Sequence, residues 1–205
     1  MPDAGSAVQP LEVGKLWCPR CWALARFQPV AALAFRCSRC EWQFLLSAAT
    51  VATPAVPLTT VPAVNATGTV AAVTITGGTV TSVNVNGAQA GTTAGTYLVP
   101  VAGTISVTYS AAPAWAWALP ATSAGVSAGG AALPLAAGGT SFAPEQVLIV
   151  DPAGTSDVVK VSGAPTATSV PVNSLNSAHN SGVLVSVAQL APLLPGVEAV
   201  PQTSY

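Results

Sequence analysis

The sequence predicts a mainly β protein, in which a small N-terminal four-cysteine zinc ribbon precedes two small antiparallel β-sandwich or barrel-like modules. Three observations predict this fold class. All four cysteines fall within residues 16–42, as two Cys-x2-Cys pairs. From residue 67 onward, short β-branched runs alternate with Ser and Thr between Gly and Asn turn signals. No stretch of useful length in residues 65–118 has helical periodicity.

The composition indicates a protein whose surfaces are covered by neighbours. Charged residues make up 6% of the 205 residues, against roughly 25% in an ordinary soluble domain. The hydrophobic fraction is 51% and the formal net charge is only −1. So few charges protect a monomer poorly against association. We therefore expect an assembly protein.

The distribution of charge divides the chain. Five of the six Lys and Arg residues precede residue 46, and residues 42–144 contain no charged side chain. The change coincides with a run of Pro and small residues, "SAATVATPAVPLTTVPAV", which is typical of a linker. The expected organisation is a zinc ribbon at 1–47, a Pro/Ala-rich extended linker at 48–66, a β-domain at 67–118, a linker at 119–130, a second β-module at 131–190 and an extended C-terminal tail at 191–205.

The cysteine spacing predicts one structural zinc ion. Cys18 and Cys21 form the first pair, and Cys37 and Cys40 follow after fifteen residues. Two thiolates separated by two residues can turn inward on one tight turn, and two such turns complete a tetrahedron around Zn²⁺. Four thiolates leave no coordination position for a substrate water, so a catalytic zinc is not expected.

Two disulfides are the competing explanation of the four cysteines. The N-terminus "MPDAGSAVQP" lacks the basic and apolar regions of a signal peptide, and no window reaches the roughly 18–20 apolar residues of a membrane span. We therefore expect folding in the cytosol, where thiols stay reduced, and this expectation favours zinc.

The aromatic and basic residues around the cysteines allow two interpretations. Arginines interleaved with tryptophans are suited to phosphate contact and base stacking, here Arg20, Arg26, Arg36 and Arg39 with Trp17, Trp22 and Trp42. The alternative is a folding and docking module with a small core of Trp22, Phe27, Leu33 and Phe35. The small positive charge of this segment favours the second interpretation, because nucleic-acid binders carry a strong basic patch.

The sequence of the middle of the chain predicts short strands joined by turns. Asn86-Gly87 predicts a tight hairpin turn. Trp115 and Trp117 fall on the same side of an extended segment, and burial against the sheet is preferred to an exposed recognition pair.

The last module is expected to contain strands at "QVLIVD", "SDVVKVSG", "TSVPV" and "VLVSV". His179 is the only histidine, and the sequence places neither a nucleophile nor an acid partner at useful spacing from it, so we expect a structural role. Glu145, Asp151 and Asp157 are the only carboxylates near one another. No catalytic residue and no enzymatic activity are predicted.

This module resembles small β-units of tailed-bacteriophage structural proteins. Their pattern contains "GTTSF", Gly and "VLIVD", then a Glu-Val-Val-x-Val strand and "AH-x-x-G"; this chain has "GGTSFAPEQVLIVD", "SDVVKVSG" and "AHNSGVLV". It departs at Glu145, where the pattern has Gly, and at Asp157, where it has Glu. The segment "VTITGGTVTSVNVNG…GTYLVPVAGTISVTYSAAPAW" similarly resembles β-domains in virion proteins of actinobacteriophages.

The resemblance implies a non-enzymatic virion protein that is folded in the host cytoplasm. The first expectation is a capsid decoration or minor capsid protein that docks on the major capsid protein, on copies of itself, or on both, as a homo-oligomer on the particle. A minor tail, fibre or head–tail connector protein is the alternative, and a zinc-ribbon nucleic-acid-binding protein is the second alternative. No membrane partner is expected, and nucleic acid is not favoured.

Overall fold

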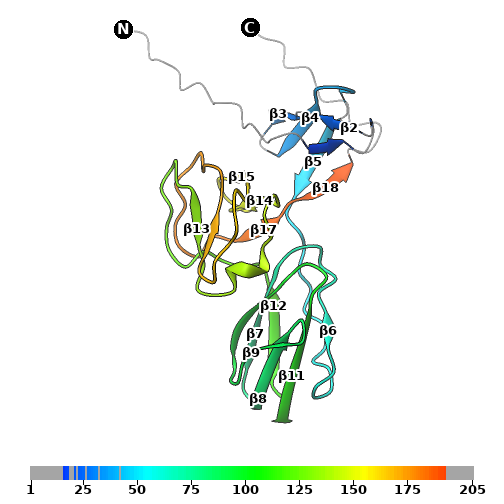
Figure 1. The fold of residues 1–205 in the computed structure, drawn as a ribbon, viewed down its shortest axis with the longest axis vertical. Helices are drawn as coiled ribbons and strands as arrows, with labels where there is room; N and C mark the ends of the chain where they lie inside the picture. The colour runs from blue at the N-terminus through cyan, green and yellow to red at the C-terminus, as the bar shows by residue number, and fades with distance from the viewer. Residues whose placement is uncertain are drawn as a thin grey trace. The chain divides into compact units, whose positions relative to one another are not determined.

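The computed structural model describes residues 16–18, 21, 23–25, 27–31, 33–41 and 43–192. Within these ranges the chain forms eighteen strands and one short 3-10 turn, with no α-helix (Figure 1), which confirms the mainly β prediction. The chain divides into two compact units. We call residues 1–47 with 190–205 the ribbon unit, and residues 48–189 the β unit.

The described residues of the ribbon unit form two small sheets. One pairs β1 (Leu16–Cys18) with β2 (Ala23–Ala25), and the other has the order β18-β5-β4-β3. The bounds of these four strands are β3 Phe27–Ala31, β4 Ala34–Cys37, β5 Gln43–Ser47 and β18 Gln189–Pro192. Of the expected small core, Phe35 is buried and Leu33 is half-buried. The side chains of Trp22 and Phe27 lie outside the described residues.

The ribbon unit includes a strand from the far end of the chain. The sequence places residue 190 at the end of the second β-module and an extended tail after it. In the structure, β18 is instead a neighbour of β5 in the ribbon sheet, and the two lie side by side in Figure 1. The chain therefore passes between the two units twice, once at residue 48 and once at residue 189.

A two-sheet sandwich occupies the first part of the β unit; we call it the sandwich module (residues 63–118). Its sheets have the orders β10-β7-β12 and β6-β11-β8-β9. The strands are β6 Ala63–Val64, β7 Ala71–Thr76, β8 Thr79–Val85, β9 Ala88–Gly91, β10 Gly95–Val99, β11 Thr104–Ala111 and β12 Ala114–Ala118. Alternate residues point inward, as the period-two pattern predicts, so Val73 and Ile75 of one sheet share a core with Val83 and Val107 of the other.

The predicted hairpin turn and the buried tryptophan pair are both present. Asn86 and Gly87 have φ of 51° and 78° and join β8 to β9, the arrangement of a two-residue primed turn. Trp115 and Trp117 are 7% and 5% exposed and meet edge to face, with ring centroids 5.6 Å apart. Both predictions are confirmed.

The adjacent glycines Gly77 and Gly78 allow the cost of a left-handed backbone conformation to be separated from the cost of a steric clash. Both residues have positive φ, 64° and 66°. A Cβ at Gly77 would meet open space, whereas a Cβ at Gly78 would lie 2.6 Å from the Ala111 carbonyl oxygen and 2.7 Å from the Pro113 nitrogen. We expect Gly77→Ala to cost about 1 kcal/mol from the left-handed conformation alone, and Gly78→Ala to cost clearly more. Urea unfolding of both variants measures the difference, and equal losses would contradict this close approach of the backbone.

The Pro-rich segment 48–66, expected to be a linker, packs along the sandwich module. The Pro54 carbonyl oxygen accepts the Trp115 indole N–H at 2.8 Å, and the Pro57 carbonyl oxygen accepts the Tyr109 hydroxyl at 2.9 Å. The Thr53 hydroxyl accepts the Trp117 backbone N–H at 2.9 Å. The segment therefore accepts hydrogen bonds from the Trp115 and Tyr109 side chains and from the Trp117 backbone, and it belongs to the module that it covers.

A buried asparagine joins the loops at one end of the sandwich. Asn65 is completely buried, and its side-chain amide donates to the carbonyl oxygens of Thr69, Val99 and Pro100 at 2.8, 3.0 and 2.9 Å. Its side-chain oxygen accepts the backbone N–H and the hydroxyl of Thr67 at 3.1 and 2.6 Å. One side chain thus connects two separate stretches of backbone, residues 67–69 and 99–100.

The rest of the β unit forms the C-terminal module (residues 119–188). Its elements are β13 Ala132–Pro134, a 3-10 turn Gly139–Ser141, β14 Val147–Val150, β15 Asp157–Lys160, β16 Ser169–Pro171 and β17 Val185–Val187. The sheets have the orders β13-β16 and β15-β14-β17, so each of the four expected strand segments contains a strand. The expected linker 119–130 belongs to this module, because Ala121, Thr122 and Val126 form bridges to its other segments.

The two modules of the β unit are joined by packing and by hydrogen bonds. Val70, just before β7, is fully buried in the hydrophobic core of the C-terminal module. The Thr69 hydroxyl accepts the Val187 backbone N–H at 2.9 Å, and the Ser186 hydroxyl accepts the Ala49 N–H at 2.9 Å. These contacts explain why residues 48–189 form one compact unit.

Candidate metal centre

The second cysteine pair forms a tight turn at the end of β4. Cys37 is the last residue of this strand and is completely buried, and residues 38–40 form the turn. The Cys37 sulfur accepts the backbone N–H of Arg39 at 3.5 Å, and the Cys37 carbonyl oxygen accepts that of Glu41 at 2.9 Å. Glu41 has φ of 56°, a left-handed conformation that reverses the chain after Cys40. This geometry directs both thiols of the pair to one side.

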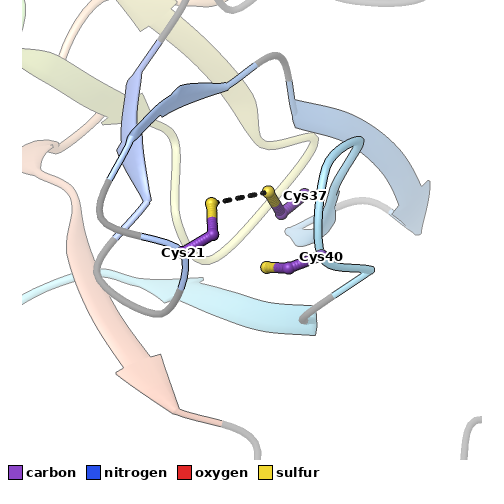
Figure 2. A group of neighbouring side chains, drawn as sticks. All are labelled: Cys21, Cys37 and Cys40. Carbon is purple, nitrogen blue, oxygen red and sulfur yellow. Dashed lines mark hydrogen bonds between the residues drawn. The ribbon is translucent and has the colours of Figure 1, made fainter.

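The first pair contributes a third sulfur to the same place. The Sγ atoms of Cys21, Cys37 and Cys40 all lie within 4.8 Å of one another (Figure 2), and those of Cys21 and Cys37 are 4.0 Å apart. Zn–S bonds of about 2.3 Å in a tetrahedron separate neighbouring sulfurs by about 3.8 Å. A disulfide between Cys21 and Cys37 would need about half of the observed distance. The three residues form a cluster that can hold a metal ion.

No family model, curated protein or solved structure matches this chain.

The chemistry of the centre therefore has to be inferred from its own residues. Three of the four predicted ligands lie together. Cys18 ends β1, where its backbone pairs with Ala23 of β2, and its side chain lies outside the described residues. Three sulfur ligands favour a soft or borderline metal such as zinc over magnesium or calcium, which prefer oxygen.

The structure describes only part of the predicted basic and aromatic surface. Arg39 is exposed in the turn between Cys37 and Cys40, and Arg36 is half-buried on β4. The side chains of Arg20, Arg26, Trp17, Trp22 and Trp42 lie outside the described residues. In the part of the chain that the structure describes, no helix is long and apolar enough to cross a membrane.

His179 has two acid partners that are far from it in the sequence. Its Nε2 lies 3.0 Å from the Asp157 carboxylate and its Nδ1 lies 3.8 Å from the Asp151 carboxylate, and the imidazole is buried. Asp157 is also buried and accepts the Ser177 backbone N–H at 2.9 Å. Asp151 and Asp157 flank the β14–β15 turn, and His179 pairs through its backbone with Val126. The expectation of no acid partner was wrong, because sequence separation hides groups that the fold brings together.

We expect His179→Ala to destabilise the β unit by about 3 kcal/mol, because it leaves the buried Asp157 carboxylate with a single described donor, the Ser177 N–H. The matched control is Lys160→Ala, which removes an ion pair of similar length, 2.8 Å to Glu145. The Glu145 side chain is 73% exposed, so this pair contributes at most about 1 kcal/mol. Urea unfolding followed by tryptophan fluorescence compares the two variants, and similar losses would show that the histidine pair does not stabilise the module.

Proposed function

We propose that this chain is a non-enzymatic structural protein of a tailed-phage particle, of the capsid decoration or minor capsid type. The observation that carries the proposal is the charge-free surface of the sandwich module. No residue from 42 to 144 is charged, yet this stretch builds both sheets of the sandwich and its covering segment. Charged side chains are a usual protection of exposed sheet edges against association. A surface without them suits a protein that is covered by a neighbour.

Apolar side chains gather along one edge of the sandwich module. Leu58, Val61 and Val64 are 78%, 45% and 59% exposed, and they lie in the segment that runs beside β11 into β6. Exposed apolar groups in a contiguous segment indicate a contact surface when they are not scattered. In the proposed assembly this edge meets a shell protein or another copy of the chain.

The phage-like pattern in the C-terminal module has a physical basis in the fold. The acidic residue and the histidine of the pattern, Asp157 and His179, meet in a buried pair at 3.0 Å. Gly182 has φ of 82°, and Glu145, which stands where the pattern has Gly, has φ of 69°. Both values are conformations that glycine adopts without strain. These positions of the pattern thus have structural roles in this fold, and this is our reason for giving weight to the resemblance.

The metal centre supplies the stability that the ribbon unit cannot obtain from a small core. We propose one structural Zn²⁺ held by Cys18, Cys21, Cys37 and Cys40, with the ribbon as a docking element of the assembly. A closed set of thiolate ligands contributes folding energy and leaves no position for substrate. Native mass spectrometry should find one zinc per chain, and a mass four hydrogens lower without metal would mean two disulfides instead.

Association of the purified full-length chain tests the function. We expect closed oligomers, or binding to purified phage shells, in sedimentation velocity and cryo-electron microscopy. Replacing Leu58 and Val64 together by Ser should weaken this association and leave the β unit folded, since both side chains are exposed. A zinc-loaded monomer at every concentration, with no affinity for shells, would contradict the proposal. If such a monomer binds DNA or RNA with strong salt dependence, the alternative of nucleic-acid binding replaces it.

A further inference from the structure

The sheet that carries Cys37 is assembled from two distant parts of the chain. Its order is β18-β5-β4-β3, so the strand after the metal-binding turn, β5, lies between β4 and β18 (Figure 1). Strand β18 begins at Gln189, and residues 48–189 between β5 and the rest of β18 belong to the other unit. The only described partner strand of β18 is β5.

The turn that carries Cys37 and Cys40 leads directly into β5. Cys37 ends β4, Cys40 closes the turn, and Gln43 begins β5, so both cysteines lie in the hairpin that β5 completes. The third sulfur, that of Cys21, comes from the turn after β1. The sulfurs of Cys21, Cys37 and Cys40 lie close together, and that of Cys37 is buried. Three neighbouring thiolates are favourable when a metal ion compensates their charge.

We propose that metal binding and docking of the C-terminal strand β18 are coupled, so that β18 contributes to metal affinity and loss of the metal releases β18. This inference rests on the metal-holding role proposed above. Residues 190–192 of β18 have a single described neighbouring strand, and so have too few contacts to stay docked when that strand loses its position. Linkage is reciprocal: if the metal stabilises docking of β18, docking of β18 tightens metal binding by the same factor.

Hydrogen exchange on the full-length chain, with zinc and after chelation, tests the first half of the coupling. On removal of zinc, whichever of the Leu190 and Ala191 amides pairs with β5 should lose protection together with the amides of β4 and β5. Protection of β14 in the β unit should stay unchanged, because no predicted metal ligand lies there. Continued protection of that amide after chelation would overturn the proposal.

Proline substitutions in β18 test the second half. Successive amides of an edge strand alternate between the neighbouring strand and solvent, so only one of Leu190→Pro and Ala191→Pro removes a paired N–H. The variant that removes it should bind zinc at least tenfold more weakly, about 1.4 kcal/mol, in competition with a chelator. The other variant is its matched control, and protection of β14 verifies that each variant has a folded β unit.

The outcomes distinguish a failure of the proposed coupling from a failure of the proposed metal centre. If the unaltered chain binds no zinc, the metal centre fails, and the coupling fails with it. If the unaltered chain binds zinc and both proline variants bind it equally well, the metal centre stands and the coupling alone is overturned.

Discussion

Replacing Cys37 by Ser should abolish metal binding and unfold the ribbon unit while the β unit keeps its strands. Cys37 is the completely buried member of the cysteine cluster, and its sulfur lies 4.0 Å from that of Cys21. Structural zinc sites contribute on the order of 10–16 kcal/mol in small zinc-finger peptides, more than a core as small as that of the ribbon can replace. Metal content per chain and hydrogen exchange of β4 and β5 measure the effect.

Ser38→Ala is the matched control for Cys37→Ser. Ser38 is exposed in the same turn, one residue further along, and its hydroxyl is not among the predicted ligands. This variant should bind one metal ion and keep the protection of β4 and β5. Two observations would contradict the prediction: a folded ribbon in metal-free Cys37→Ser, or a loss of strand content in the β unit as well.

Replacing Asn65 by Ala should cost the β unit at least about 3 kcal/mol, because several buried polar groups lose their partner at once. The carbonyl oxygens of Thr69, Val99 and Pro100 lose the amide donors, and the Thr67 N–H loses its acceptor. Asn65→Asp should be similarly severe, because a carboxylate would face three carbonyl oxygens in a buried site. Urea unfolding with tryptophan fluorescence reports both losses.

Asn84→Ala is the matched control for Asn65. Asn84 lies on β8, is half-buried, and pairs with Ser106 of β11 through the backbone. A change there should stay within about 0.5 kcal/mol of the unaltered chain. If Asn65→Ala were equally mild, the loops that it joins would be held by other contacts.

Features that depend on neighbouring residues could be predicted from the sequence. The Asn86-Gly87 turn follows from two residues that tolerate positive φ, and the burial of Trp115 and Trp117 follows from the alternation along one strand. The turn that brings Cys37 and Cys40 together follows from their spacing, because a Cys-x2-Cys turn directs its two sulfurs to one side. These inferences need only local geometry, whereas the approach of Cys21, 16 residues before Cys37, was expected only because both pairs should bind one ion.

Features that depend on tertiary pairing could not be predicted in this way. The Pro-rich segment 48–66 has the composition of a linker, but its carbonyl groups meet the indole and phenol donors of distant strands. His179 and Asp157 are 22 residues apart, and only the folding of the β14–β15 turn against residues 173–182 brings them together. Nothing in residues 189–192 indicates that their partner is β5, near the other end of the chain.

The double passage of the chain between its units has a mechanical consequence. If the chain is pulled at the segments before β1 and after β18, the force acts first on the ribbon unit. The reason is that residues 48–189 are inserted between β5 and β18, which are neighbours in the ribbon sheet. As long as these strands stay paired, the β unit bears no load. Rupture of the ribbon would transfer the force to the β unit, whose full extension would release roughly 500 Å of chain at about 3.5 Å per residue. The ribbon unit would thus yield before the larger β unit is loaded, and a bound metal ion would raise the force at which it yields.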